Sequence, residues 1–364
     1  MPQVMLQDRR AARMIDAKNI PIIIVSYRNP KDVTECLEAL RKSAADPKFD
    51  VYICENGGTA AFDGLVASLA GGSSPCEHIA APDSMPDEAP RFVRVGCFRL
   101  RGRAARVLIA EAKENLGYAA AINAWLTVLL AAPDWPGLWV LNPDTQPDAG
   151  ALAELVAWSA TRARGMVGSR IVPSRRPDLI HSRGLRWRPL HASTEAVDYH
   201  APSAIAPDPD DVEARIDAPS GASVYVTRSC LERIGLMDER YFLYFEDLDW
   251  GYRAKNCCGI GYAYKSIVPH HGGTTIGSAG SRSARSQLSV YLEFRNRIHF
   301  VGEYHPGWMP WTILVLLVRP LAYGMVGAFA NMRTAFRGVL MGLAGETGRP
   351  DHVVKSHGRR NVSS

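Results

Sequence analysis

Short runs of branched apolar residues alternate with segments of helical spacing along the first half of the chain, and this alternation constrains the fold more than any other feature. Residues 20–26 (IPIIIVS) and 49–54 form two such runs, and residues 31–43 between them place apolar side chains on one face of a helix. A strand, a helix and a strand in this order form a right-handed crossover between parallel strands. Comparable runs recur at 105–110 and 138–141. We therefore predict an α/β fold with a mixed, mostly parallel sheet covered by helices.

The second half of the chain is less regular. A stretch rich in glycine, serine and proline at 71–91 predicts a long loop, and residues 175–214 are polar and rich in proline. A strand pattern returns at 220–226, and helical spacing at 287–303 predicts the first of the C-terminal helices. We expect four regions: an N-terminal extension (1–19), an α/β domain (20–285), a C-terminal helical region (286–340) and a flexible tail (341–364).

The segment from Trp308 to Asn331 is almost wholly apolar, but Arg319 and Pro320 interrupt it near its middle. A helix that spans a bilayer needs about 20 uninterrupted apolar residues, and a central arginine is costly there. We interpret the segment as two helices that pack on the domain or lie in a membrane interface, with insertion into lipid as the alternative. Basic residues follow it and suit an anionic membrane surface.

The composition indicates which classes of partner the protein binds and in which cellular compartment it works. A net charge of +5 over 364 residues suits a partner that carries phosphates, but it is too small to indicate nucleic-acid binding. The seven cysteines are odd in number and show no CxxC spacing, which favours reduced, mostly buried thiols. The first 19 residues lack the apolar core of a signal peptide. We expect a cytoplasmic protein, and the apolar segment leaves open peripheral contact with the inner face of the cell membrane.

Polar side chains follow three of the predicted strands. They are 26–28 (Ser-Tyr-Arg), 55–56 (Glu-Asn) and 142–144 (Asn-Pro-Asp). In open α/β sheets, ligands bind beyond the carboxyl ends of the strands, so we expect these groups to share one cleft. Asp144 would be held rigidly at the edge of that cleft, where a carboxylate can bind a hard divalent cation. An ordinary Asn-Pro-Asp turn is the alternative.

Two further clusters carry reactive side chains. Glu246, Asp247 and Asp249 lie among aromatic residues, where like charges raise one another's pKa toward the range of a general base. An acidic helix start, stabilised by the helix dipole, is the alternative. His270 and His271 precede two glycines and could place an imidazole on a metal, although a histidine pair is more often structural.

In this order, the clusters resemble the family-2 glycosyltransferases of the GT-A fold, in particular the bacterial rhamnosyltransferase-like branch. The resemblance spans roughly residues 20 to 300, and as an ordered set its motifs are highly specific. The matching segments are 23–27, 55–56, 115–123 (NLGYAAAIN), 141–144 (LNPD), 220–222 (SGA), 234–249 (IGLMDERYFLYFEDLD), His271 and 291–296 (YLEFRN).

The resemblance implies a role for each matching position. Asp144 would bind Mg²⁺ or Mn²⁺ against the donor diphosphate, and His271 would help to hold the metal or the diphosphate. Asp247 would be the catalytic base, with Glu246 supporting it or binding the acceptor. The implied nucleotide-sugar-binding residues are Ser26, Tyr27, Arg28, Glu55, Asn56, Asn115, Gly117, Asn123, Asn142 and Arg253; among them Tyr27, Glu55 and Asn115 face the nucleoside and Arg253 approaches the diphosphate.

The implied function is the inverting transfer of a sugar from a nucleoside-diphosphate sugar to an acceptor hydroxyl, in the synthesis of a cell-surface glycan or glycoconjugate. The branch favours dTDP-rhamnose as donor, with UDP- and GDP-sugars as alternatives, and a glycan, a glycolipid or a small molecule as acceptor. Two positions depart from the family pattern, because Glu55 and Asn142 each stand where aspartate is common.

Two other functions compete with a glycosyltransferase. A nucleotidyltransferase would need a glycine-rich basic loop after the first strand, where this chain has Tyr-Arg-Asn-Pro. A non-catalytic sugar- or nucleotide-binding protein on the same fold would tolerate the loss of Asp144 or Asp247, and both are present.

Overall fold

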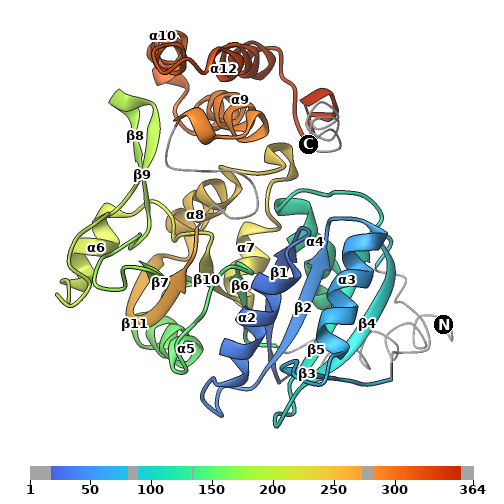
Figure 1. Cartoon of the computed structure of the whole chain (residues 1–364). Helices are drawn as coiled ribbons and strands as arrows, with labels where there is room; N and C mark the ends of the chain where they lie inside the picture. Colours follow the sequence, from blue (N-terminus) through green and yellow to red (C-terminus); the bar gives the residue numbers. More distant parts are fainter. Residues whose placement is uncertain (1–17, 81–88, 133–134, 273–281, 354–364) are drawn as a thin grey trace, which may run out of the picture.

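The computed structural model describes residues 18–80, 89–132, 135–272 and 282–353, and its centre is one twisted sheet flanked by helices (Figure 1). Within these residues the sheet has nine strands in the order β11-β7-β10-β6-β1-β2-β5-β4-β3. The strands are β1 (Ile20–Ser26), β2 (Phe49–Glu55), β3 (Cys76–His78), β4 (Phe92–Leu100), β5 (Arg106–Ala112), β6 (Gly137–Leu141), β7 (Met166–Pro173), β10 (Ser223–Thr227) and β11 (Ile260–His270), and a separate hairpin contains β8 (Leu185–Arg188) and β9 (Ser193–Ala196).

All strands of the sheet except β4 and β10 run in the same direction. The predicted fold class, an α/β fold with a mixed, mostly parallel sheet, is therefore confirmed. The α-helices are α2 (Pro30–Arg41), α3 (Thr59–Ala70), α4 (Ala119–Leu130), α5 (Ala151–Arg162), α6 (Pro209–Arg215), α7 (Arg228–Ile234), α8 (Glu246–Cys257), α9 (Gln287–Tyr304), α10 (Met309–Val318), α11 (Leu321–Gly324) and α12 (Phe329–Leu343).

Helices cover both faces of the sheet, and each face has its own apolar core. One core joins the sheet to α4, α7 and α8, and the other joins it to α2, α3 and α5. Successive residues of β1 point to opposite faces: Ile23 belongs to the first core, whereas Ile22 and Ile24 belong to the second. A strand that is buried on both faces explains the continuous apolar run at 20–25.

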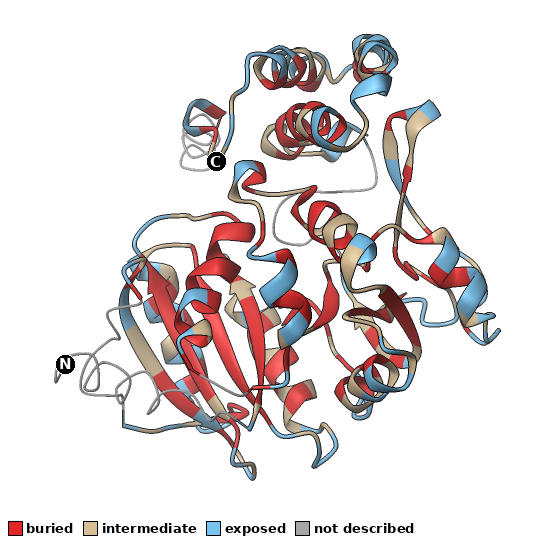
Figure 2. Cartoon of the chain, turned by 180° about the vertical axis from the view of Figure 1, so that it is seen from behind, coloured by how far each residue is buried: buried red, intermediate tan, exposed pale blue. Residues whose placement is uncertain are grey.

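The C-terminal helices α9, α10 and α12 form a separate layer beyond the end of the sheet (Figure 1). In α9, Val290, Phe294 and Ile298 are buried against α10 and α12. The outer faces of α10 and α12 are exposed, as Figure 2 shows. No helix in the described ranges is long and apolar enough to cross a membrane.

Several local features differ from the sequence-based expectations. The predicted 71–91 loop contains the short strand β3, and its residues 81–88 lie outside the described part. The described start of the predicted tail is packed, because Glu346 accepts a 2.6 Å hydrogen bond from the Tyr291 hydroxyl. Most of the predicted N-terminal extension also lies outside the described residues.

Candidate active site

The carboxyl ends of β1 and β2 lie side by side and are joined by Glu55. Its carboxylate is buried and accepts hydrogen bonds from the Ser26 hydroxyl and from the backbone N–H groups of Arg28 and Gly57, the latter two at 3.1 and 2.7 Å. These contacts hold Arg28 at a φ of +58°, a conformation that is strained for a residue with a side chain. The half-buried Tyr27 lies next to it at the sheet edge, so Glu55 shapes the loop that presents Tyr27 and Arg28.

The segment before α4 is fixed to the same edge by Asn56. Its side-chain amide donates to the Gly117 carbonyl at 2.8 Å and accepts from the Leu116 N–H at 3.2 Å. Asn115 accepts a hydrogen bond from the Gly117 N–H at 3.0 Å. The structure thus brings Ser26, Tyr27, Arg28, Glu55, Asn56, Asn115 and Gly117 together at one edge of the sheet, as the sequence predicts.

Asp144 follows β6 and meets the end of β11. Its carboxylate oxygen Oδ1 lies 3.1 Å from Nε2 of His270, and its carbonyl oxygen accepts from the His271 N–H at 3.0 Å. Burial opposes ionisation of Asp144, but the hydrogen bond and charge of His270 outweigh it and lower the pKa of this carboxyl below its usual value. Asp144 is therefore ionised near neutral pH, as a cation ligand must be.

The histidines fit a divalent cation beside Asp144. The His271 ring contacts the Asp144 carbonyl oxygen through Nδ1, at 3.3 Å, which leaves the Nε2 lone pair as a ligand atom. The buried Nδ1 of His270 has no hydrogen-bond partner among the described residues. Within those residues no three His, Cys, Asp or Glu side chains form a metal cluster, so a cation would need further oxygen ligands from elsewhere.

Asp247 lies at the start of α8, and its carboxylate is held by backbone donors. Oδ2 accepts from the Gly221 N–H at 3.2 Å, and Oδ1 accepts from the Leu248 N–H at 2.8 Å. Burial raises the pKa of Asp247 above its usual value. Burial and the neighbouring Asp247 charge raise the pKa of Glu246 further, and Oε2 of Glu246 has no hydrogen-bond partner among the described residues. Both carboxyl groups therefore hold a proton more readily than a solvent-exposed carboxyl group does.

Tyr118 connects the two carboxylate centres, a contact that sequence reasoning missed. Its hydroxyl lies 2.9 Å from Oδ1 of Asn142 and 3.0 Å from the carbonyl oxygen of Gly221. Asn142 is two residues before Asp144, and the Gly221 N–H binds Asp247. Tyr118 stands within the NLGY motif, but its own role could not be inferred because both partners are distant in sequence.

Two of the predicted binding residues lie elsewhere. Asn123 binds the backbone N–H and carbonyl groups of Met237 at 3.0 and 2.8 Å, and so joins α4 to the loop after α7. Arg253 forms an ion pair with Asp249 at 2.7 Å and donates to the Leu236 carbonyl at 3.0 Å. It follows Asp247 by six residues on α8, so the helical rotation directs it toward Asp249 and away from Asp247.

The segment that precedes Glu246 is conformationally strained. Phe242, Tyr244 and Phe245 have φ values of +63°, +68° and +77°, in the left-handed region that residues with side chains rarely adopt. The surroundings hold this segment in place: Asn296 donates hydrogen bonds to the carbonyls of Leu243 and Tyr244, both at 2.8 Å. Strain of this kind is found mainly at functional sites.

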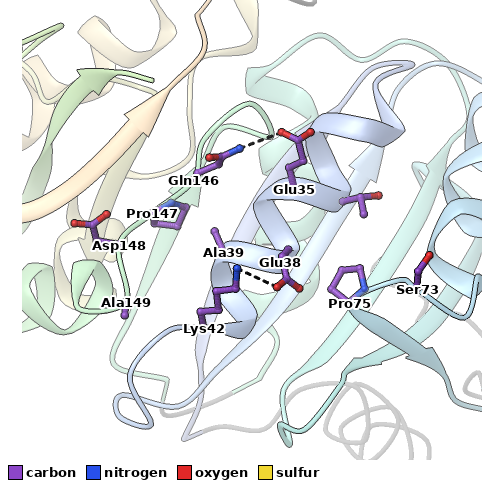
Figure 3. Close-up of a pocket in the computed structure, with 11 residues that line it drawn as sticks. Glu35, Glu38, Ala39, Lys42, Ser73, Pro75, Gln146, Pro147, Asp148 and Ala149 are labelled. Atoms are coloured by element: carbon purple, nitrogen blue, oxygen red, sulfur yellow. Dashed lines mark hydrogen bonds and ion pairs between the residues drawn. The ribbon is translucent and has the colours of Figure 1, made fainter. Parts of the chain in front are cut away.

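The described part of the surface includes a hollow beside Asp247 and a larger one beside α2. A cavity of about 170 Å³ opens beside Asp247 and is lined by Leu185, Thr194, Tyr244, Phe245, Asp247, Leu248, Glu293 and Arg297. A larger hollow of about 560 Å³ lies between α2 and the segment 146–149 (Figure 3). In the larger hollow, the Glu35 carboxylate accepts a hydrogen bond from the Gln146 amide at 3.0 Å. Glu38 forms an ion pair with Lys42 at 3.1 Å. None of the predicted site residues lines it.

The chain is similar to known glycosyltransferases, although no family model matches it. It is 29% identical over 227 residues to the N-acetylglucosaminyl-diphospho-decaprenol L-rhamnosyltransferase of two Mycobacterium tuberculosis strains, covering 55% of this chain and 69% of that protein. It is 22% identical over 266 residues to the low-salt glycan biosynthesis hexosyltransferase Agl10 of Haloferax volcanii, covering 66% and 76%. The predicted resemblance to rhamnosyltransferase-like glycosyltransferases is thereby confirmed.

Among solved structures, the mannosyltransferase PcManGT from Pyrobaculum calidifontis, in complex with GDP-Man and Mn²⁺, also matches. The TM-score is 0.47 and the identity 16%, over 99% of this chain and 88% of that one.

Proposed function

We propose that this chain, a relative of the rhamnosyl- and hexosyltransferases described above, is an inverting glycosyltransferase in which Asp247 is the general base. The observation that carries the proposal is the state of Asp247: a half-buried carboxylate with a raised pKa, oriented by two backbone N–H groups and facing a cavity. A base near neutral pH needs these properties, because it must be ionised yet able to hold a proton. A non-catalytic binding protein would not need them.

The reaction follows from this arrangement. The Asp247 carboxylate accepts the proton of the acceptor hydroxyl, whose oxygen bonds to the anomeric carbon as the bond from that carbon to the diphosphate breaks. Attack occurs on the face opposite the diphosphate, so one displacement inverts the configuration. Asp144 and His271 would hold Mg²⁺ or Mn²⁺, which would neutralise charge on the leaving diphosphate. The loop carrying Tyr27 and Arg28 would receive the nucleoside.

We further propose a lipid-linked acceptor and a dTDP-rhamnose donor, with a UDP-sugar as the second candidate donor. The rhamnosyltransferase of M. tuberculosis is named for a diphospho-decaprenol acceptor, which supports the first choice. Exposed apolar side chains on α10 to α12 support it independently, because they could lie against the membrane that holds such an acceptor. The enzyme would then work at the inner face of the cell membrane, in the synthesis of a surface glycan.

Thermal unfolding with nucleotides tests the donor and the metal together. The full chain is heated with UDP, dTDP or GDP, each in Mn²⁺ or in EDTA. A ligand at a hundred times its dissociation constant stabilises the folded state by about 2.7 kcal/mol, which is readily measured. We expect a Mn²⁺-dependent rise with dTDP. A rise with none of the nucleotides would contradict the proposal and favour a protein that does not use nucleotide sugars.

A further inference from the structure

A buried arginine, Arg297 of α9, is part of the lining of the cavity beside Asp247. Its side chain is only 5% exposed and lines the cavity together with Asp247. No ion pair or hydrogen bond of its guanidinium is found among the described residues, and Nε is buried without a partner there. Its neighbours are the rings of Phe245 and Phe294, 5.7 and 5.6 Å from the guanidinium carbon. A buried charge without a carboxylate partner destabilises a fold by several kcal/mol.

The surrounding charges do not neutralise Arg297. Glu293, the carboxylate that attracts the charge of Arg297 most strongly, is already paired with Arg285, whose Nη1 lies 2.9 Å from Oε2. The positive charge of Arg319, at the end of α10, repels that of Arg297. Arg319 also donates a hydrogen bond to the carbonyl of His191 in the β8–β9 hairpin, at 3.1 Å. Arg285, Arg297 and Arg319 thus outnumber the two carboxylates around the cavity, Glu293 and Asp247. The surplus positive charge suits an anion, and guanidinium groups bind phosphate oxygens in bidentate fashion.

The position of the cavity separates it from the expected donor site. Its walls come from the β8–β9 hairpin, the start of α8 and α9, and none of the strand-end residues that present Tyr27 or Asp144 lines it. Arg319 directly follows the exposed Leu317 and Val318 of α10. A phosphate at Arg297 would thus lie between the proposed base and an apolar surface.

We propose that Arg297, assisted by Arg319, binds the diphosphate of a lipid-linked acceptor, with the acceptor sugar at Asp247 and the lipid directed toward α10. The proposal rests on the proposed function for the identity of the acceptor. It assigns the arginines to binding and positioning, because they do not touch the reacting atoms.

Binding without turnover tests the site directly. Farnesyl diphosphate and farnesol are titrated into the full chain by calorimetry, with and without saturating dTDP and Mn²⁺. We expect farnesyl diphosphate to bind at least tenfold more tightly than farnesol and dTDP not to displace it. Arg297→Gln should weaken farnesyl diphosphate at least tenfold, whereas Arg175→Gln, at a position outside the cavity, should bind like the wild type. Equal binding by Arg297→Gln, or full displacement by dTDP, would overturn the proposal.

A second set of measurements covers the remaining outcomes. If Arg297→Gln does not fold, Arg319→Gln replaces it, and a loss of less than threefold in that variant would count against the site. Vesicles of phosphatidylglycerol distinguish a membrane headgroup: weaker vesicle binding by the variant, with unchanged farnesyl diphosphate binding, would also overturn the proposal.

Kinetics separate this proposal from the proposed function. With an N-acetylglucosaminyl-diphospho-lipid acceptor, Arg297→Gln should raise the acceptor KM at least tenfold and leave the donor KM within twofold. A rise in donor KM alone would move the arginine to the donor site. If no donor is transferred by the wild type, yet farnesyl diphosphate binding depends on Arg297, the proposed function fails and the phosphate site stands.

Discussion

Asp247 and Glu246 are neighbours in the chain, but their carboxylates have different surroundings. Asp247 accepts two backbone hydrogen bonds, which favour its charged form, whereas Oε2 of Glu246 has no partner in the described part of the chain. The pKa of Glu246 is consequently raised further than that of Asp247. Enzymes use differences of this kind in environment to give two carboxyl groups separate acid and base roles.

The first prediction concerns the base. Asp247→Asn keeps the size of the side chain but cannot accept a proton, so we expect transfer to fall by about 10²- to 10⁴-fold. Binding of the donor nucleotide, measured by thermal unfolding, should be unchanged. Transfer at the normal rate by this variant would show that another group is the base.

The second prediction concerns the buried acid. The pKa of Glu246 is raised in the folded state, so its contribution to stability is fully present below its unfolded pKa and is lost as the pH rises through the folded value. The glutamine in Glu246→Gln has no carboxyl group to ionise, so the variant does not lose this contribution to stability as the pH rises. We therefore expect the melting temperature of the variant, relative to wild type, to increase between pH 5 and pH 8. A difference that is constant with pH would mean that Glu246 is not buried as a neutral acid.

At the scale of single residues, the sequence predicted which side chains gather but not every contact. The order of the motifs, which resembles that of a known family, allowed the meeting of Asp144 and His271 to be predicted. In the sequence, 127 positions separate the two residues. The structure places His270, not His271, against the Asp144 carboxylate. Arg297 carried no sequence signal, since an arginine within an amphipathic helix resembles any solvent-exposed one.

At the scale of elements, the strained segment at 242–245 depends on the loop before α4. Gly117 has a φ of +80°, and a Cβ there would lie 2.3 Å from the carbonyl oxygen of Phe242. The Tyr118 N–H donates to that same oxygen at 2.7 Å. The two segments that carry Asn115 and Glu246 are thus held together at a single glycine.

The third prediction follows from this contact. Gly117→Ala should destabilise the fold by about 2 kcal/mol more than Gly58→Ala, because forced overlap costs about 1–3 kcal/mol. Gly58 is the matched control, because its φ is +83° and a Cβ added there would meet no atom within 4 Å among the described residues. Urea unfolding of the two variants measures the difference. Equal destabilisation would show that the Phe242 contact relaxes freely.

Apolar runs buried on both faces of the sheet were readily predicted as strands, and β1, β2 and β6 lie within a residue of their expected bounds. The strand β11 was not predicted, since its residues 260–270 mix polar and apolar types at the edge of the sheet. The segment around Glu246 was expected only as an acid-rich region, because its left-handed backbone arises from tertiary contacts.

At the scale of the whole molecule, the most unusual surface is the outer side of α10 to α12. Exposed apolar residues gather there, and Met325 is 88% exposed. Figure 2 shows exposed stretches along these helices. The others are Trp308, Trp311, Leu314, Leu317, Val318, Leu321, Val326, Phe329, Leu340 and Leu343. Contiguous apolar surface of this kind usually contacts a partner or a membrane. The sequence predicted helices here, but not which of their side chains remain uncovered.

The fourth prediction is that this surface binds anionic vesicles. Replacing Leu317 and Leu321 by serine should weaken co-sedimentation with phosphatidylglycerol vesicles at least about tenfold, since burying a leucine contributes about 1.5–3 kcal/mol. The matched control replaces Val93 and Ile205, which are also exposed but lie outside the C-terminal helices. Equal binding by both double variants would exclude these helices as the contact surface.

The edge position of β11 has a consequence for the making of the protein. Its last residue, His270, supplies the contact to Asp144, and α9, which supplies Arg297, comes later still. A nascent chain therefore synthesises the loops that follow β1 and β2 before it completes either charged centre. Prematurely terminated products that stop before residue 270 would lack both His270, the partner of Asp144, and Arg297.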